Sequence, residues 1–370
     1  MTSRERVLAA IQNRKPDRMP MDFGGTAMSV CEPEFLNKMR AALGLTLPED
    51  RDPDGTWVDE AIQKHLEVDL RWVPHKPPLV QLRQIDPAAY EDEKARRQEQ
   101  RELAASVKTH KVKHDFPLAD CTLDDVRRMR PNLPPPPPMM DWYIETARRY
   151  REGGYATTFW VSGGFFEVGC KKRGYDQFAM DLVLQPDLVR ALFDLWLEEK
   201  LHRIDTVVKP LAPYIDLFCY GDDFGLQNGP FMAPQTFGDI IKPYFQAQYS
   251  HLQEAAPHSY LFHHSCGSVY KLLDDIVDMG VNVLNPVQPR AADMEPEKLL
   301  AKGRGRLCFH GGMDLQQLLP FGSPDDVREE AERRMKIFSD DGGYICAPAH
   351  SLPEDVPVEN ILALFSSDRG

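Results

Sequence analysis

The amino-acid sequence predicts an α/β protein built as a (β/α)8 TIM barrel. Eight short runs rich in β-branched and aromatic residues recur along the 370 residues, most of them closed by Gly, Asp or His. Helical patterns such as 185–211 and 327–340 separate these runs. Apolar strands that alternate with helices indicate parallel βαβ units, and polar residues collect at the strand ends, where such a barrel builds its active site. A doubly wound open sheet is the alternative, because periodicity alone does not exclude it.

The predicted barrel takes up most of the chain, which we treat as a single domain spanning 1–370. Its strands are, in chain order, 19–25, 68–73, 156–164, 215–223, 259–267, 281–288, 306–314 and 343–350. The run at 68–73 shows the weakest pattern. A helical extension precedes the first strand, since Thr2 followed by Glu5 forms a capping-box pattern ahead of an apolar run.

One region departs from the strand–helix alternation, at about 84–140. Residues 87–113 are highly charged, and five prolines follow at 134–138. The charged stretch is typical of a solvated helix or hairpin, and the proline run of a stiff extended spacer. Barrel-like strands flank both sides, so we interpret the region as an excursion from the barrel rather than a domain boundary.

Composition narrows the classes of partner. The 44 Lys and Arg against 57 Asp and Glu give a net charge of −13, which argues against nucleic acid or an anionic membrane. A small-molecule substrate fits this charge, and a homodimer stays open. No apolar stretch is long enough to span a bilayer, and the N-terminus does not resemble a secretion signal. Seven scattered cysteines favour a reduced, cytoplasmic protein over a disulfide framework.

A His-x-Cys pair at the end of the fifth predicted strand is a candidate metal site. Residues i and i+2 of a strand point to the same side, so His264 and Cys266 project together at the barrel mouth. Zinc accepts mixed nitrogen and sulfur ligands, and a catalytic zinc takes about three protein ligands plus an open position. The alternative is a buried cysteine beside a hydrogen-bonded histidine, which spacing alone does not exclude. We expect Ser268 to cap a helix that starts at Val269.

The eighth strand offers two candidates for a third ligand. Cys346 is the softer donor, but it lies within an apolar run, where free cysteines are often core residues. His350 follows Pro348 at the loop end, where a ligand is expected, and is preferred. Glu167 is a candidate fourth group, although a helix-start glutamate is the plainer interpretation.

Three further strand ends carry polar residues. Asp222 and Asp223 are consecutive and face opposite ways, so at most one points into the pocket and the other caps a turn or helix. The acceptor in the pocket would hold a substrate group or orient a metal-bound histidine. The same arrangement recurs in two more places, which gives a predicted polar pocket containing Asn285, Gln288, His310 and Asp314.

Several common catalytic signatures are absent from the sequence. It contains no G-x-G-x-x-G after a strand, no P-loop and no G-x-S-x-G nucleophile elbow. Nicotinamide-dependent, nucleotide-triphosphate-dependent and serine-hydrolase functions are therefore not expected.

Several segments in the same order resemble the uroporphyrinogen decarboxylase superfamily, in particular its corrinoid-dependent methyltransferase branch. They are RERVLAAIQNRKPDRMPMDFGG, VDLRWV, YGDDFGLQNGPFMAPQTFGDIIKPYF, HHSCGSVYKLLDDIVDMGVNVLNPVQP, FHGGMDLQQLLPFGSPDDVREE and GGYICAPAHSLPEDVPVENILAL. The resemblance implies a (β/α)8 barrel. The decarboxylase proper holds its substrate carboxylates with arginines in an N-terminal loop, and 21–30 of this chain contains none. Porphyrinogen decarboxylation is therefore not expected.

The methyltransferase branch binds zinc through an H-x-C pair and a distant cysteine. His264 and Cys266 match the pair, whereas the distant position falls at His350, with Cys346 four residues earlier. The resemblance thus implies zinc, a small methyl donor such as a methyl ether, and a corrinoid carried by a partner protein. Two alternatives stay open. One is a metal-independent decarboxylase or lyase using Asp222 or Asp223, and the other a non-catalytic barrel that binds a small molecule.

Overall fold

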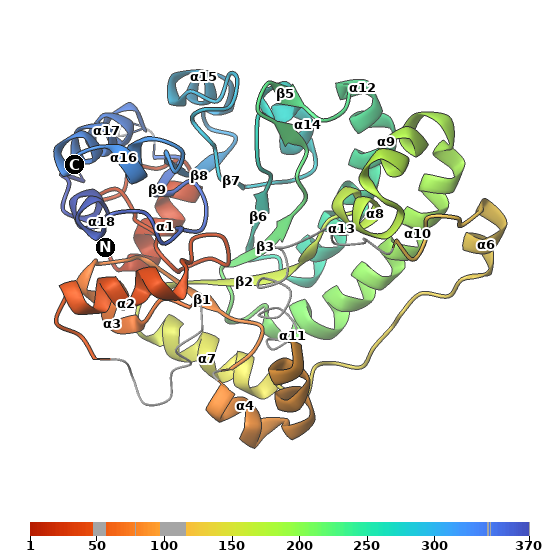
Figure 1. The fold of residues 1–370 in the computed structure, drawn as a ribbon, viewed down its shortest axis with the longest axis horizontal. Coiled ribbons are helices and arrows are strands. Elements are labelled where there is room, and N and C mark those ends of the chain that lie inside the picture. The colour runs from red at the N-terminus through yellow and green to blue at the C-terminus, as the bar shows by residue number, and fades with distance from the viewer. Residues whose placement is uncertain (47–56, 78, 97–115, 339, 341, 370) are drawn as a thin grey trace, which may run out of the picture.

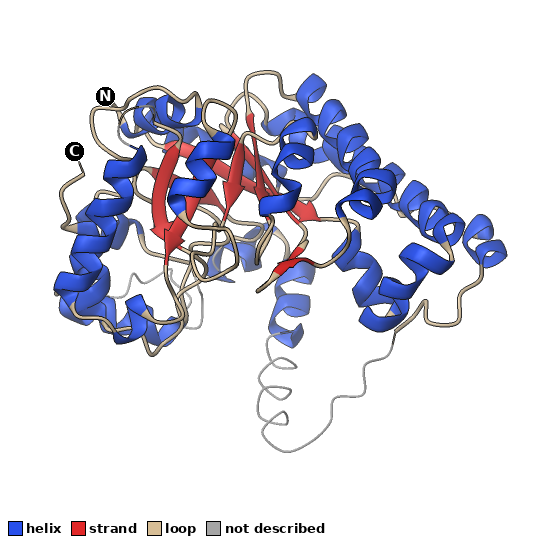
Figure 2. Ribbon diagram, turned by 90° about the horizontal axis from the view of Figure 1, so that it is seen from above, coloured by secondary structure: helices blue, strands red, loops and turns tan. Residues whose placement is uncertain are grey.

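The computed structural model describes residues 1–46, 57–77, 79–96, 116–338, 340 and 342–369, and it shows a curved parallel sheet surrounded by helices (Figures 1 and 2). The neighbouring strands are β1 (Leu70–Val73), β2 (Ala156–Gly163), β3 (Leu217–Gly221), β6 (Tyr260–His264), β7 (Val283–Asn285), β8 (Cys308–Met313) and β9 (Tyr344–Pro348). Each pairs in parallel with the next. The predicted strands from 68–73 onward are all present.

The first predicted strand, 19–25, closes the sheet as a single bridge. Met21 pairs in parallel with Cys346 of β9. The Asp22 amide donates to the Cys346 carbonyl at 2.9 Å, and the Asp69 amide, just before β1, donates to the Met21 carbonyl at 3.0 Å. The segment therefore joins both edges of the sheet and completes the predicted (β/α)8 barrel. It is short because the chain turns at once, with the Gly24 amide donating to the Ser29 carbonyl.

The barrel interior is filled by apolar side chains that alternate along the strands. The buried set is Leu70, Ala156, Leu217, Cys219, Phe262, Val283, Cys308 and Ile345, together with Val7, Ala10 and Ile11. The last three come from α1 (Ser3–Ile11), which packs against β1, β2 and β9. Both capping-box hydrogen bonds between Thr2 and Glu5 are present, so the predicted N-terminal helix is confirmed.

Helices cover the outside of the sheet. The longer ones are α2 (Pro33–Ala42), α3 (Glu60–His65), α7 (Met140–Glu152), α8 (Phe166–Arg173), α9 (Tyr175–Leu184), α10 (Pro186–Arg203), α13 (Lys242–Ala255), α14 (Leu273–Asp278), α15 (Pro296–Gly303), α17 (Pro324–Phe338) and α18 (Val358–Phe365). Shorter elements are η1 (Ile204–Val208), α11 (Lys209–Leu211), β4 (Gly225–Leu226), β5 (Gly229–Pro230), α12 (Pro234–Thr236), η2 (Phe237–Ile241), η3 (Tyr270–Leu272) and α16 (Leu318–Phe321). None of the described helices is both long and apolar enough to cross a membrane.

The two helices predicted from long periodic patterns are both found. The pattern at 185–211 forms α10, which continues through the π-helical η1 into α11. The pattern at 327–340 forms α17, which begins three residues earlier than predicted, at Pro324. Pro is favoured in the first turn of a helix because its missing N–H would have no intrahelical partner there.

The charged part of the excursion is helical where it is described, and the proline run is extended. The excursion contains α4 (Leu79–Ile85), a helical stretch at 87–96 and α6 (Leu123–Arg128). The remainder of the charged stretch, 97–113, lies outside the described residues. The proline run passes along α10, where His202 Nε2 contacts the Pro134 carbonyl at 2.7 Å. The run therefore connects α6 to α7 along the outside of the barrel (Figure 1), as an extended spacer would.

A buried lysine in α10 makes stability depend on pH. Lys200 Nζ donates to the Gly163 carbonyl at 2.5 Å and lies 5.0 Å from the centre of the Phe165 ring. Burial, together with the charges of Arg203 and Lys172, lowers the pKa of Lys200 to about 8 against the opposing effect of Asp222 and Glu199. The unfolded chain keeps the ordinary lysine pKa of about 10.4.

We predict that the unfolding free energy of the wild type rises between pH 8 and about 10.4 relative to that of Lys200→Met. In this range the unfolded chain binds the proton that the folded chain has lost, and the difference amounts to about 3 kcal/mol. Urea unfolding of both proteins at pH 7.5, 8.5, 9.5 and 10.5 measures it. A difference that stays constant over this range would contradict the prediction.

Candidate metal centre

Three side chains with metal-binding atoms meet at the carboxyl ends of two strands. His264 is the last residue of β6, Cys266 follows two residues later, and His350 lies two residues beyond β9. Their ligand atoms all lie within 4.8 Å of one another. His264 Nε2 is 3.4 Å from Cys266 Sγ, and the two imidazole centroids are 5.4 Å apart. We call His264, Cys266 and His350 the His–Cys–His group.

The spacing of the His–Cys–His group fits a tetrahedral cation. Zinc bonds of about 2.0–2.1 Å to nitrogen and about 2.3 Å to sulfur place neighbouring ligand atoms roughly 3.3–3.8 Å apart. The 3.4 Å contact between His264 Nε2 and Cys266 Sγ already lies in this range. Two imidazoles and one thiolate would leave the fourth position of a zinc ion open, as catalytic zinc requires.

Burial leaves the two imidazoles ready to bind a cation and keeps the thiol protonated until a cation binds. It lowers the pKa of His264 and of His350, so both imidazoles are neutral and can offer a lone pair. Burial, and then Asp223, raise the pKa of the Cys266 thiol to about 12. Because a cation binds the thiolate, binding at Cys266 would release a proton.

Cys346 does not join the His–Cys–His group, for a reason that follows from strand geometry. In β9, Ile345 points into the barrel and belongs to its interior cluster. The neighbouring Tyr344 and Cys346 therefore face the surrounding helices, and both belong to the outer core. His350 lies beyond this alternation, in a loop tied down by hydrogen bonds from the Ala349 amide to the Met313 carbonyl and from the Leu352 amide to the Val30 carbonyl.

The turn that carries Cys266 is held by two side chains from neighbouring strand ends. Asp223 Oδ1 accepts from the Cys266 amide at 2.8 Å, and Gln288 Oε1 accepts from the Gly267 amide at 2.9 Å. Asp223 Oδ1 also lies 3.6 Å from His264 Nε2. Gly267 has a φ of +77°, and a Cβ there would lie 2.4 Å from the Gly225 carbonyl carbon. Only glycine therefore fits at position 267 without displacing the turn.

Asp222, next to Asp223, faces the opposite way and caps a helix. Its carboxylate accepts from the amides of Phe165, Phe166 and Glu167 at 2.7–2.8 Å, at the start of α8. Glu167 itself pairs with Lys171 one turn along the same helix at 3.4 Å. Both residues therefore make structural contacts, and neither belongs to the His–Cys–His group.

Two further predicted site residues lie behind His264. Asn285 Oδ1 is 2.5 Å from His264 Nδ1, and Asn285 Nδ2 is 2.8 Å from His310 Nδ1. His310 Nε2 is in turn 2.9 Å from Asp22 Oδ2. His310 is fully buried, so its contact with the His–Cys–His group is indirect, through Asn285. Asp314 accepts from the Gln316 amide at 2.8 Å and stabilises the turn after β8.

Sequence reasoning missed Asp22. The signal was available, because Asp22 is a polar residue within the predicted strand 19–25, as Asp222, Asn285 and His310 are within theirs. In the sequence analysis, the segment 21–30 was used only for its lack of arginine.

The predicted cap at Ser268 is wrong. Ser268 Oγ donates to the Ala292 carbonyl at 2.5 Å, and the following η3 begins after Val269 without a side-chain cap. Gly267 lies in close contact with Gly225 of β4, so the turn at 265–268 packs against β4. In this position the Ser268 hydroxyl does not face the start of η3.

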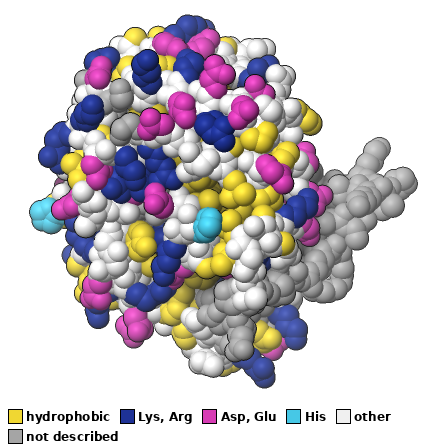
Figure 3. Space-filling view, turned by 90° about the vertical axis from the view of Figure 1, so that its left-hand side faces the viewer, with side chains coloured by type: hydrophobic (Ala, Val, Ile, Leu, Met, Phe, Trp, Pro, Cys, Tyr) yellow, Lys and Arg dark blue, Asp and Glu magenta, His cyan; other side chains and the backbone are white. Residues whose placement is uncertain are grey.

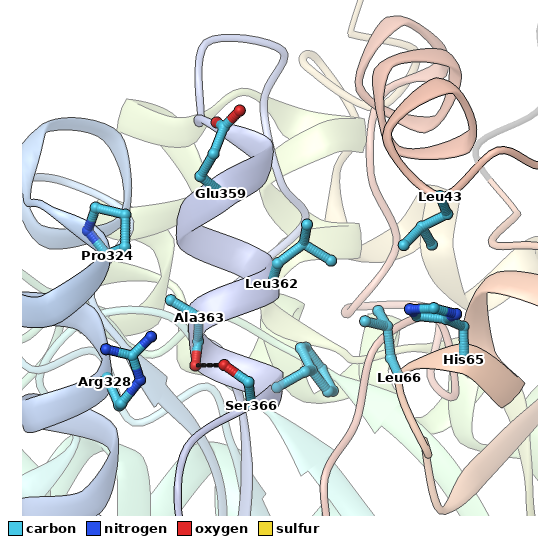
Figure 4. A pocket seen from close by; sticks show the side chains of 10 residues that line it. Leu43, His65, Leu66, Pro324, Arg328, Glu359, Leu362, Ala363 and Ser366 are labelled. Atoms are coloured by element: carbon cyan, nitrogen blue, oxygen red, sulfur yellow. Dashed lines mark hydrogen bonds between the residues drawn. The ribbon is translucent and has the colours of Figure 1, made fainter.

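A surface groove of about 440 Å³ lies away from the His–Cys–His group and shares no residue with it. It is formed by α2 and α3 on one side and α17 and α18 on the other (Figure 4). Apolar walls come from Leu43, Leu66, Leu362 and Phe365. The face of the molecule on this side carries hydrophobic side chains gathered among charged ones (Figure 3).

The comparison with family models decides which family the barrel comes from. Residues 107–369 match the model for uroporphyrinogen decarboxylase (URO-D). The chain belongs to the uroporphyrinogen decarboxylase family. The match begins inside the excursion and covers the strands from β2 onward, including all members of the His–Cys–His group. The family resemblance predicted from the residues is therefore confirmed, while the N-terminal segments lie outside the matched range.

Solved structures extend the likeness over the whole chain. A methyltransferase from Methanosarcina mazei is 17% identical with a TM-score of 0.63, and the alignment covers 98% of this chain and 97% of that one. At this identity, the likeness shows a shared fold. A psychrophilic endo-β-1,4-xylanase is 9% identical with a TM-score of 0.38, over 60% of this chain and 80% of that one. A xylanase from termite gut is 10% identical with a TM-score of 0.39, over 60% and 61%.

Both xylanase TM-scores lie below 0.5, so neither likeness bears on this member of the uroporphyrinogen decarboxylase family. No curated protein matches the chain.

Proposed function

We propose that this member of the uroporphyrinogen decarboxylase family is a zinc-dependent methyltransferase. It would move a methyl group between a small-molecule donor, such as a methyl ether, and a corrinoid carried by a partner protein. The observation that carries the proposal is the His–Cys–His group at the barrel mouth, with ligand atoms within 4.8 Å of one another. The full-length likeness to the fold of a methyltransferase agrees with it.

Each residue near the His–Cys–His group has a distinct role in this proposal. When bound, zinc would supply a Lewis acid that polarises the donor oxygen. His264, Cys266 and His350 would hold the ion, and Asp223 adds negative charge 3.6 Å from His264 Nε2. Trp160 packs edge-on to His264, with ring centroids 6.4 Å apart, and would offer an apolar surface to the donor. A reduced corrinoid on the partner would supply the methyl acceptor, and the ether oxygen would leave with the electron pair of its bond to the methyl carbon.

The metal-independent decarboxylase is the weaker candidate, because its proposed residues are engaged elsewhere. Asp222 caps α8, which leaves Asp223 to stabilise a cationic intermediate. In the loop that would hold substrate carboxylates, Asp22 and Ser29 are buried and hydrogen-bonded to each other at 2.6 Å. Turnover of a carboxylated substrate in the presence of a chelator would favour the decarboxylase. Ligand binding without turnover would favour a non-catalytic barrel.

Metal analysis tests the proposal. We expect purified wild type, reconstituted with zinc and desalted, to hold about one zinc per chain, and His264→Ala and Cys266→Ala to hold less than about a tenth of that, because losing one of three ligands weakens binding steeply. Inductively coupled plasma mass spectrometry measures the content.

The matched controls are Cys121→Ala and His251→Ala, which remove a thiol and an imidazole far from the His–Cys–His group and should leave the zinc content unchanged. A wild type without zinc after reconstitution would overturn the proposal, as would Cys266→Ala with a full equivalent.

A further inference from the structure

A buried chain of hydrogen bonds runs from the back of His264 to the first turn of the barrel. It passes from His264 through Asn285 and His310 to Asp22, with donor–acceptor distances of 2.5, 2.8 and 2.9 Å. The exposed fractions are 6% for His264, 1% for Asn285 and zero for the other two. Water therefore has little access to these groups, and each must form its hydrogen bonds with other groups of the protein.

The Asp22 end of the chain has a fixed polarity. Asp22 Oδ1 accepts from the Gly25 amide at 2.8 Å, and Oδ2 accepts from the Ser29 hydroxyl at 2.6 Å. Because a carboxylate only accepts, the His310 nitrogen facing it, Nε2, must carry a proton and donate. A neutral His310 then has a lone pair on Nδ1, which can only accept.

The donor and the acceptor of the two remaining hydrogen bonds follow from the first. His310 Nδ1 accepts from Asn285, so the Asn285 amide nitrogen must face His310 and its oxygen must face His264. His264 Nδ1 therefore carries the proton and donates to Asn285 Oδ1. The lone pair of His264 is then on Nε2, the atom that lies 3.4 Å from Cys266 Sγ. If the chain ran the other way, Nε2 would be protonated and unable to bind a cation.

We propose that Asp22 is a positioning residue that sets the tautomer of His264 through His310 and Asn285, and so keeps Nε2 free to bind a metal ion. The inference rests on the proposed function for its purpose, although the tautomer itself is a property of the metal-free protein. Nothing in the chain has to change its protonation. Asp22 touches neither the His–Cys–His group nor the space in front of it.

Asp22→Asn is the sharpest test, because it changes a few atoms and disturbs the polarity. The amide has one oxygen, and both the Gly25 amide and His310 Nε2 need an acceptor. If the oxygen faces the Gly25 amide, the amide nitrogen of residue 22 faces His310 Nε2 and donates to it. Every donor and acceptor along the hydrogen bonds to His264 is then exchanged. We expect metal-free wild type to show His264 as the Nδ1–H tautomer in ¹⁵N-histidine NMR spectra at pH 8. Asp22→Asn should shift it to Nε2–H or to a mixture.

Zinc affinity gives the second readout. Competition with a chromogenic chelator should show affinity lowered about 10–100-fold in Asp22→Asn, the range typical for residues behind a metal ligand. Asn285→Leu, which removes both hydrogen bonds made by Asn285 and keeps the number of side-chain heavy atoms, should do the same and serves if Asp22→Asn does not fold. Asp216→Asn is the matched control, because it alters a buried carboxylate before the amino end of β3 and should leave both readouts unchanged.

The outcomes separate this inference from the proposed function. Two results would overturn the inference and leave the proposed function standing, provided that the wild type binds zinc. One is a wild type with His264 as the Nε2–H tautomer. The other is an unchanged His264 tautomer and an unchanged zinc affinity in both variants. A wild type with the Nδ1–H tautomer, lost in Asp22→Asn, that binds no zinc supports the positioning chain and overturns the function. Equal effects of Asp216→Asn would reduce Asp22 to a general structural role and overturn the inference.

Discussion

Replacing Cys266 by alanine should lower the rate of methyl transfer to cobalamin at least about 1000-fold. In the proposed zinc site the Cys266 thiolate would be the one anionic ligand of the His–Cys–His group, so its loss would remove both a bond to zinc and the charge that holds the cation. Loss of a Lewis acid that contributes several kcal/mol to the transition state corresponds to this factor, since about 4 kcal/mol equals roughly 1000-fold.

The assay follows the absorbance change as reduced cobalamin becomes methylcobalamin, with a panel of methoxylated phenols as donors and free cobalamin replacing the carrier protein. Chelator treatment of the wild type should give the same loss, and added zinc should restore the wild type but not Cys266→Ala. Cys121→Ala is the matched control. A Cys266→Ala rate above a tenth of the wild-type rate would refute the role of the thiolate.

The largest effect on stability should come from Asp69, which ties the first turn of the barrel to β1. Its fully buried carboxylate accepts from Arg6 Nη1 at 2.7 Å, Arg18 Nη1 at 2.8 Å and the Met21 amide at 2.9 Å. Asp69→Ala leaves Arg6 Nη1 and the buried Met21 amide without this acceptor, while Arg6 keeps its ion pair with Asp17. Breaking a buried pair from one side costs about 3–5 kcal/mol, a large share of a total stability of about 5–15 kcal/mol.

Urea unfolding followed by circular dichroism measures the loss for Asp69→Ala. The matched control is Asp124→Ala, an exposed carboxylate that pairs with Arg127 at 3.4 Å and should change stability by less than about 1 kcal/mol. If the two variants lose the same small amount, the Asp69 contacts do not hold the barrel together.

Local patterns along the chain were enough to predict the parallel strands and helices of the barrel. The runs at 156–164 and 306–314 alternate with helical patterns, and such alternation indicates parallel strands, although it does not distinguish a closed barrel from an open sheet. The capping box at Thr2 and Glu5 involves residues three apart, so it too is readable from the sequence. His264 and Cys266 could be placed on the same side of the barrel because the two-residue period of a strand is local.

The excursion shows where local patterns stop being informative. Its charges predict a solvated helix or hairpin, and a helix is present at 87–96. They do not predict the contacts by which the proline run follows α10. Similarly, consecutive aspartates at 222 and 223 must face opposite ways, yet only the position of α8 decides that Asp222 is the one that caps it.

The sequence by itself determined the alternating strands and helices, the strand ends that carry polar residues and the His264–Cys266 pair, because each depends on neighbours a few positions apart. Tertiary structure alone decided that His350 rather than Cys346 meets this pair, since that depends on which way β9 faces in the closed sheet. It alone also brought Asp22 to His310, 288 positions away. Contacts of this kind arise from barrel closure, which no local pattern encodes.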